Sequence, residues 1–191
     1  MEAQTIIESK TFVGQDYSGQ SLKGKEYTEC VFNNSNFTGA DLTNCHFMDC
    51  KFKNCNLSNV KVIGCRFQEV LFIGCKLLGL FFSRINPFLL SLKFVDCIIT
   101  NCDFANLRIA KTGFLNSKLL DSYFGNTDLR GCNFSGSDLK ETEFDNCNLA
   151  NADFRNAINY SLDPRKNKVE GAKFSNPEVI GLLDYFEIKI E

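Results

Sequence analysis

Residues 35–44 read Ser35-Asn36-Phe37-Thr38-Gly39 and then Ala40-Asp41-Leu42-Thr43-Asn44. Each unit of five runs small, Asn or Asp, bulky apolar, polar, and then Gly or Asn. Outward from these units, every fifth residue is apolar from Phe12 to Phe82 and from Phe94 to Phe154, at all 28 positions. Since 44% of the chain is apolar, a random sequence would give such a run roughly once in 10¹⁰ trials. The five-residue repeat therefore decides the fold.

A period of five fits neither a straight helix nor a straight strand. On an α-helix, five residues advance about 140° beyond a full turn, so the apolar positions would spiral around the axis. On a strand, an odd step moves the side chain to the opposite face. The pattern requires a chain that turns a corner about every five residues, with each central side chain pointing inward. Of the 19 Phe residues, 15 occupy this central position.

The corners have their own signal two residues after each centre. At 23 of these 28 positions the residue is Gly, Asn or Asp, the types that best tolerate a left-handed backbone. Two residues before the centre, small residues predominate, as expected where little space remains near a corner. The exceptions at the corner position are Glu29, Glu69, Arg84, Lys111 and Glu141.

The order of the central residues indicates how many corners close one turn. From Phe104 to Phe154, Phe alternates with Leu or Ile, and an even number of sides would stack Phe on Phe. The inward small position holds long polar side chains only in the first four repeats, as expected for one exposed terminal coil; its residues there are Lys10, Gln15, Gln20 and Lys25. Both observations favour a square coil of 20 residues.

Four units carry a family resemblance: Ser35 to Gly39, Ala40 to Asn44, Thr127-Asp128-Leu129-Arg130-Gly131 and Ala152-Asp153-Phe154-Arg155-Asn156. They resemble the pentapeptide repeat family, over about residues 10–175. The resemblance implies an all-β fold, a right-handed quadrilateral parallel β-helix, followed here by a short C-terminal helix. We expect residues 1–176 to form the β-helix, with a register break at 83–93, and residues 177–191 to form a capping or dimerisation helix and tail.

The register shifts by two residues between Phe82 and Phe94. Pro87 lies in this segment and cannot donate to a ladder of strands, so we expect a local outward loop that carries Pro87 and Phe88. Two interpretations remain open. The loop is a tolerated insertion, or it contacts a partner protein, since loops on repeat scaffolds often carry function.

The end of the chain predicts a helix. Asn176-Pro177-Glu178 gives an Asn cap, Pro at the first position and an acid in the first turn, and a strand is expected at 187–190. An isolated helix of about ten residues is unstable and must pack on something. It is either a monomeric cap or a homodimer interface, which the quinolone-resistance (Qnr) branch of the family implies. Its expected apolar face comprises Val179, Ile180, Leu182, Leu183 and Phe186.

No residue pattern indicates catalysis, a metal or a cofactor. All ten Cys occupy the small inward position, where Cys serves as a small apolar residue, so we expect free thiols in a reducing compartment. The single His, His46, precedes a centre and is expected at the surface. Asp residues before centres alternate with Asn, as turn-bonding residues do. We therefore expect a protein that is not an enzyme.

Charge and hydropathy limit the classes of molecule that the protein is expected to bind. The net charge of −2 argues against a direct nucleic-acid-binding surface. The first ten residues lack the pattern of a signal peptide, and the apolar run from Val70 to Phe82 is too short to span a bilayer. We expect a cytoplasmic protein that binds neither membranes nor nucleic acids directly.

Two functions remain open. The resemblance to the Qnr branch implies a DNA mimic that binds a type II topoisomerase, DNA gyrase or topoisomerase IV, and protects it from quinolones or toxins. Residues 121–159 carry seven acids and three bases, whereas residues 1–120 have a net charge of +3, so only the C-terminal half suits such mimicry. The expected acidic contacts are Asp121, Asp128, Asp138, Glu143, Asp145 and Asp153.

The alternative is a structural scaffold that binds another protein. In the middle of the chain, outward positions are unusually apolar, and Ile73, Val95 and Leu115 are expected to stack in one row, with Leu71, Leu78, Ile98 and Leu120 nearby. A contiguous exposed apolar patch implies a partner. Equally, aliphatic residues simply suit strands.

Overall fold

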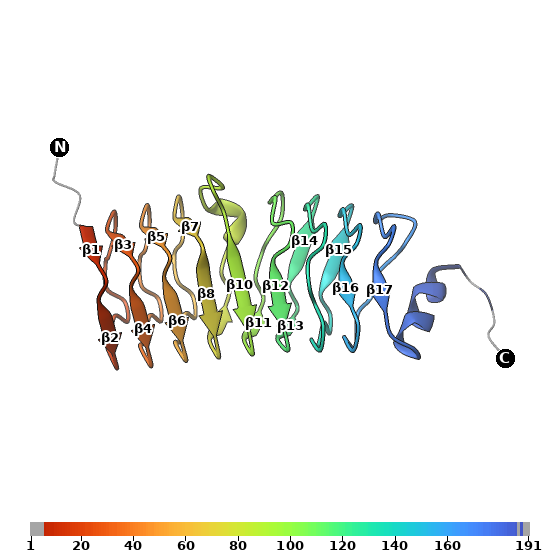
Figure 1. The fold of residues 1–191 in the computed structure, drawn as a ribbon, viewed down its shortest axis with the longest axis horizontal. Helices are drawn as coiled ribbons and strands as arrows, with labels where there is room; N and C mark the ends of the chain where they lie inside the picture. The colour runs from red at the N-terminus through yellow and green to blue at the C-terminus, as the bar shows by residue number, and fades with distance from the viewer. Residues whose placement is uncertain (1–5, 187, 189–191) are drawn as a thin grey trace.

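The computed structural model describes residues 6–186 and 188. The chain forms a rod of stacked square coils, with the N-terminus at one end and a short helix at the other (Figure 1). Each described strand pairs in parallel with a strand of the next coil, for example Phe32 with Phe52 and Phe52 with Phe72. The square parallel β-helix expected from the repeat is therefore confirmed.

We name the four sides of the rod by central residues of one coil: side 1 for Phe94, side 2 for Ile99, side 3 for Phe104 and side 4 for Ile109. Side 1 holds the longest sheet, with the strand order β12-β10-β8-β6-β4-β2. Its strands are β2 (Thr11–Val13), β4 (Val31–Asn33), β6 (Lys51–Lys53), β8 (Val70–Ile73), β10 (Leu92–Val95) and β12 (Gly113–Leu115), with β16 (Asp153–Phe154) and β17 (Lys173–Phe174) farther along.

The other sides alternate short strands with isolated bridges. Side 2 contains β9 (Lys76–Leu78), β11 (Ile98–Thr100) and β13 (Lys118–Leu120). Side 3 contains β14 (Tyr123–Gly125) and β15 (Glu143–Asp145). Side 4 contains β1 (Ile6–Glu8), β3 (Glu26–Thr28), β5 (His46–Met48) and β7 (Arg66–Gln68).

Columns of stacked rings fill the interior. On side 3, Phe82, Phe104 and Phe124 are fully buried and stack with ring centroids 4.7 and 4.8 Å apart. This matches the spacing of about 4.8 Å between paired strands. A second column on side 1 runs through Phe94 and Phe114 at 5.1 Å. The alternation of Phe with Leu or Ile therefore stacks Phe on Phe in successive coils, as expected for a coil with four sides. In the first coil, Phe12 and Tyr17 are only partly buried.

The corners adopt the left-handed conformation that their composition predicts. All 23 Gly, Asn and Asp corner residues have positive φ, and so do four of the five exceptions, Glu29, Glu69, Lys111 and Glu141, at 50–65°. The coil geometry thus imposes the left-handed conformation even on residues for which it is energetically unfavourable. Arg84 differs because it ends a 3₁₀ helix, η1 (Phe82–Arg84).

The segment after η1 bulges from the rod between β8 and β10 (Figure 1). The pairing offset between neighbouring coils is 20 residues before the bulge, for example Lys51 with Leu71, and 22 across it, as in Phe72 with Phe94. The two extra residues therefore leave the coil without disturbing the ring column on side 1, since Phe72 and Phe94 still stack at 5.1 Å.

The C-terminal helix, η2 (Glu178–Phe186), is a 3₁₀ helix rather than the α-helix whose spacing the sequence suggested. The amide of Ile180 donates to the carbonyl of Pro177, three residues back. Of the strand predicted for residues 187–190, all but Ile188 lie outside the described residues. Within the described chain, we find no helix with the length and apolar character needed to cross a bilayer.

A candidate protein-interaction surface

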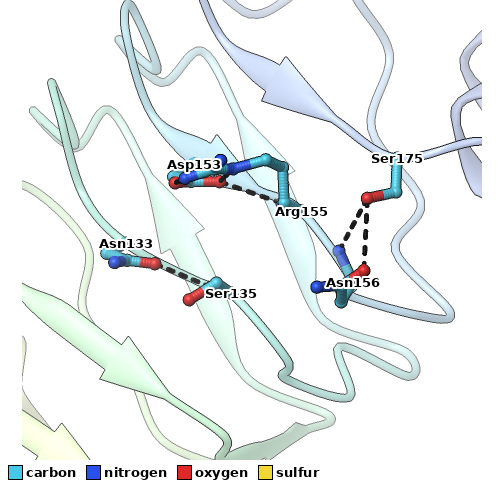
Figure 2. A network of polar contacts seen from close by, with 6 residues as sticks. All are labelled: Asn133, Ser135, Asp153, Arg155, Asn156 and Ser175. Atoms are coloured by element: carbon cyan, nitrogen blue, oxygen red, sulfur yellow. Dashed lines mark hydrogen bonds and ion pairs between the residues drawn. The ribbon is translucent and has the colours of Figure 1, made fainter.

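Asp and Asn residues before the centres bond the turn that follows them. The carboxylate of Asp153 accepts the amide of Arg155 at 3.0 Å, and Asn133 accepts the amide of Ser135 at 2.9 Å (Figure 2). At the next corner, Ser175 Oγ accepts the amide of Asn156 at 3.0 Å. The recurring acids are thus structural groups of the turns, as the alternation of Asp with Asn predicted.

Two of the expected acidic contacts are also held by the Arg two residues later. Arg130 donates to both oxygens of Asp128 at 2.8 and 2.7 Å, and Arg155 clamps Asp153 in the same way. The hydrogen bonds from Arg130 and Arg155 hold the pKa of each partner carboxyl below its ordinary value. Asp128 and Asp153 were expected to present negative charge to a partner, but each is already neutralised by its own repeat.

The six expected acids do not lie on one side of the rod. The backbone of Asp128 forms a β-bridge with that of Arg108 on side 4, and the backbone of Asp138 forms one with that of Lys118 on side 2. Asp153 lies on side 1. The coils instead bring Asp121, Glu143 and Asp145 together around side 3, because β14 and β15 pair Tyr123 with Glu143 and Gly125 with Asp145. An acidic surface exists, but it is shorter than the sequence suggested.

This surface is an open groove of about 840 Å³. We call it the acidic groove, and its lining includes Asp121, Tyr123, Glu141, Glu143, Asp145, Ser161, Lys166 and Tyr185. One end is closed by η2, where the hydroxyl of Tyr185 is hydrogen-bonded to that of Ser161. Partial burial raises the pKa of Tyr123, and the negative charge of Asp145 adds to that effect, so the phenol stays protonated as a donor.

Sequence reasoning missed the other members of this groove, among them Glu141, Tyr123 and Tyr185. The signal for Tyr123 was present in Tyr123-Phe124-Gly125. The Tyr123 ring lies over Gly125, in the space that a Cβ there would occupy. A glycine two residues after an outward Tyr on a strand therefore marks a ring lying flat across the sheet.

The predicted cap or dimer residues separate into two rows. In a 3₁₀ helix, residues i and i+3 eclipse. Val179, Leu182 and Tyr185 form the half-buried row, and Leu182 packs on the core. Ile180, Leu183 and Phe186 form the second row and are 41%, 38% and 48% exposed. The single apolar face expected from α-helical spacing is therefore wrong, because a threefold period divides the set between the core and solvent.

The bulge places its two predicted contacts outward. Pro87 and Phe88 are both exposed, and the Phe88 ring lies 5.7 Å from the Arg66 guanidinium. Asn86 accepts the amide of Phe88 at 3.0 Å, which fixes the turn. The structure thus presents Phe88 on side 4, on a different side of the rod from the acidic groove.

The expected scaffold row is formed but is less exposed than predicted. Ile73, Val95 and Leu115 are register partners on side 1, yet each is half-buried by its neighbours. Leu71 shares their side, whereas Leu78, Ile98 and Leu120 lie on side 2, where Ile98 is 46% exposed.

The cysteines and the histidine have structural environments. All ten Cys are free and buried; the thiol of Cys45, for example, donates to the carbonyl of Leu22 at 3.0 Å, and burial raises its pKa to about 11. His46 points outward but is partly covered, with Nδ1 3.7 Å from Glu26 Oε1. Among the described residues, no group of three or more His, Cys, Asp or Glu side chains is arranged to hold a metal ion.

Comparison with known proteins gives the same fold and the family. Over 97% of its length the chain superposes on all of a trypsin-treated variant of QnrB1, a plasmid-mediated fluoroquinolone resistance protein, with a TM-score of 0.64 and 18% identity. It also covers 85% of HetL, a pentapeptide repeat protein of the cyanobacterium Nostoc involved in heterocyst differentiation regulation, over 89% of this chain, with a TM-score of 0.65 and 14% identity.

No curated protein sequence matches the chain. Three sequence models of pentapeptide repeats do match, over residues 21–61 (nine copies), 50–86 (eight copies) and 85–154 (a pentapeptide repeat region). Together these matches run without a gap across the coils whose corners and ring columns are described above. The chain belongs to the pentapeptide repeat family.

Proposed function

We propose that this protein is a non-enzymatic interaction module whose acidic groove binds a positively charged, DNA-binding surface of a type II topoisomerase, DNA gyrase or topoisomerase IV. The observation that carries the proposal is the gathering of Asp121, Glu141, Glu143 and Asp145 on one side of a rod. The fold shared with QnrB1 supports it. The proposal places the protein in a reducing cytoplasm, in keeping with its ten free cysteines.

The spacing of the charges limits the length over which the acidic groove can mimic DNA. DNA carries one negative charge per about 1.7 Å of axis, whereas successive coils lie about 4.8 Å apart. The groove carries Asp121 on one coil and Glu141, Glu143 and Asp145 on the next. These four acids give one charge per about 2.4 Å of axis, so the groove approaches the charge density of DNA over two coils only. We therefore expect the groove to be one contact among several and its contribution to weaken with salt.

A gyrase supercoiling assay, with and without a quinolone, tests the proposal. The full chain should protect or inhibit gyrase, and the double variant Glu143→Gln with Asp145→Asn should lose most of this effect. The matched control Asp49→Asn with Glu69→Gln removes two exposed acids from another part of the rod and should behave as the unaltered chain. Absence of binding, inhibition and protection by the unaltered chain would refute the proposal.

We also propose that the protein forms a homodimer through η2. The exposed row Ile180, Leu183 and Phe186 supports this, because the half-buried row of Val179, Leu182 and Tyr185 already holds the helix on the rod. Leu183→Lys should convert a dimer into a monomer in sedimentation equilibrium, whereas Val13→Lys, at a 56% exposed position in strand β2 near the other end of the rod, should leave it dimeric. If the Leu183→Lys protein keeps the mass of a dimer, or the unaltered chain is monomeric, η2 is only a cap.

The alternative function is a scaffold that binds another protein through the apolar row on side 1. The contiguous stacking of Ile73, Val95 and Leu115 favours it. A Val95→Lys variant would abolish partner binding by the scaffold but would leave topoisomerase protection intact, so the two functions give opposite results with this variant.

A further inference from the structure

A second surface, of opposite charge to the acidic groove, lies midway along side 3. It is a pocket of about 320 Å³ between two successive coils, lined by Lys61 and Ile63 of one coil and Phe81 and Arg84 of the next. Arg84 is the last residue of η1. Ile63 is 46% exposed and Phe81 is 51% exposed, so the floor of the pocket presents apolar surface to solvent.

Phe81 is not needed by the core. Its neighbour Phe82 is the central residue of this repeat and is fully buried in the ring column. Phe81 therefore points outward, in the row that Asp41 and Asp103 occupy in nearby coils. Aromatic residues and Arg are enriched in protein–protein interfaces.

The two cations of this pocket have no carboxylate partner among the described residues. The acids nearest to them in the row are already engaged. Asp41 pairs with Lys23 at 3.2 Å, and Asp103 accepts the hydroxyl of Ser83 at 2.6 Å and the amide of Ala105 at 2.9 Å. The charges of Lys61 and Arg84 therefore remain available to a ligand.

Arg84 is also oriented for a ligand. Its guanidinium carbon lies 5.0 Å from the centroid of the Phe81 ring. A guanidinium that stacks on a ring keeps its N–H groups free to donate, and a carboxylate accepts two of them at once. Phe81 thus holds the cation in place and adds apolar contact surface.

We infer that this pocket, here called the Phe81 pocket, binds an acidic peptide segment of a protein partner, with one bulky apolar side chain next to its carboxylates. The apolar side chain packs on Phe81 and Ile63. A neighbouring carboxylate accepts hydrogen bonds from Arg84, and Lys61 supplies a second positive charge. The inference is independent of the acidic groove, because that groove has the opposite charge and is lined by later coils.

The probe is a fluorescein-labelled peptide pool with a central Phe or Leu flanked on each side by two positions of mixed Asp and Glu. Fluorescence anisotropy with the full chain should show saturable binding that weakens with salt. Phe81→Ser should weaken it at least about tenfold, the size expected of a hot-spot side chain. The double variant Lys61→Gln with Arg84→Gln should weaken it similarly and remove most of the salt dependence.

Three controls make the test decisive. Phe88→Ser alters the other exposed Phe that stacks on an Arg and should leave binding unchanged. A pool with Lys and Arg in place of the acids, and one with Ser at the centre, should not bind. Circular dichroism melts check that each variant is folded, as expected because the altered side chains lie outside the core.

Several results would overturn the inference. They are the absence of saturable binding by the acidic pool, equal binding by the Phe81→Ser protein, and equal binding by the pool with Ser at the centre. Stronger binding of 4-phenylbutyrate than of the peptide pool at the same residues would show instead that the pocket takes a small aryl carboxylate.

Discussion

Glu69 offers a direct measurement of the strain that the square coil imposes at its corners. Its backbone has φ 50°, in the left-handed region, where a residue with a Cβ costs about 1–2 kcal/mol. Its side chain is exposed and forms no ion pair within 4 Å among the described residues. Replacing it therefore changes the backbone preference and little else.

The variant Glu69→Gly should stabilise the protein. Relief of the left-handed strain is offset by the greater entropy that glycine loses on folding, about 0.5–1 kcal/mol. The net gain is then about 0.5–1 kcal/mol, and for a chain of this length 1 kcal/mol corresponds to a rise in Tm of about 2–4 °C. Glu69→Asn should give a smaller gain of the same sign, since Asn tolerates this conformation.

Thermal melts followed by circular dichroism, and urea titrations, measure the change. Gln68→Gly is the matched control, because Gln68 is the preceding residue, at the end of strand β7. Glycine there removes a side chain from a regular strand and should lower stability by about 0.5–1 kcal/mol. If both glycine variants shift the melting temperature in the same direction, the strain argument is wrong.

Three further predictions concern the core, the thiols and the surface acids. Phe114→Ala should cost about 3–5 kcal/mol in urea unfolding, since this fully buried ring stacks at 5.1 Å on each of its column neighbours; a cost below about 1 kcal/mol would contradict the packed column. At pH 8, a disulfide reagent should leave the native thiols unreacted and modify all ten in urea, because burial raises the pKa of groups such as Cys45 to about 11; rapid native reaction would show that the coils open. The Arg155 hydrogen bonds lower the pKa of Asp153 in the folded state, so its stabilisation is complete above the unfolded value near about 3.9 and is lost as the pH falls through the folded value. The free energy of unfolding should therefore fall less at acid pH in Asp153→Asn than in the unaltered chain, by less than about 1 kcal/mol, as for an exposed pair. An unchanged fall would show that the pair contributes nothing.

Most of the architecture could be predicted because each repeat specifies the same local conformation. Each Phe or Leu centre repeats the same inward direction, and each Gly, Asn or Asp repeats the same corner, so errors at single positions do not matter. Even Lys111, which breaks the corner rule, takes the left-handed backbone. Where the repeat ends, prediction failed. The α-helical face assigned to η2 was wrong, because nothing periodic constrained its few residues.

The candidate site was predicted only in part, because a surface depends on which side of the rod each residue occupies. Asp128 and Asp145 are both acids of the C-terminal half, yet one is clamped by Arg130 on side 4 and the other lines the acidic groove. Local composition gives the net charge of the segment, but not the side of the rod on which each charge lies. The Phe81 pocket was missed for the same reason, since Lys61 and Arg84 are brought together by stacking coils.

The sequence by itself determined the coil, its four corners and its packed interior, because these follow from a short-range pattern in which every unit adopts the same conformation. The tertiary structure alone decided which charges meet, which are neutralised and which apolar side chains stay exposed. Those properties arise between residues about 20 positions apart on neighbouring coils, a distance over which side chains interact only after the rod has formed.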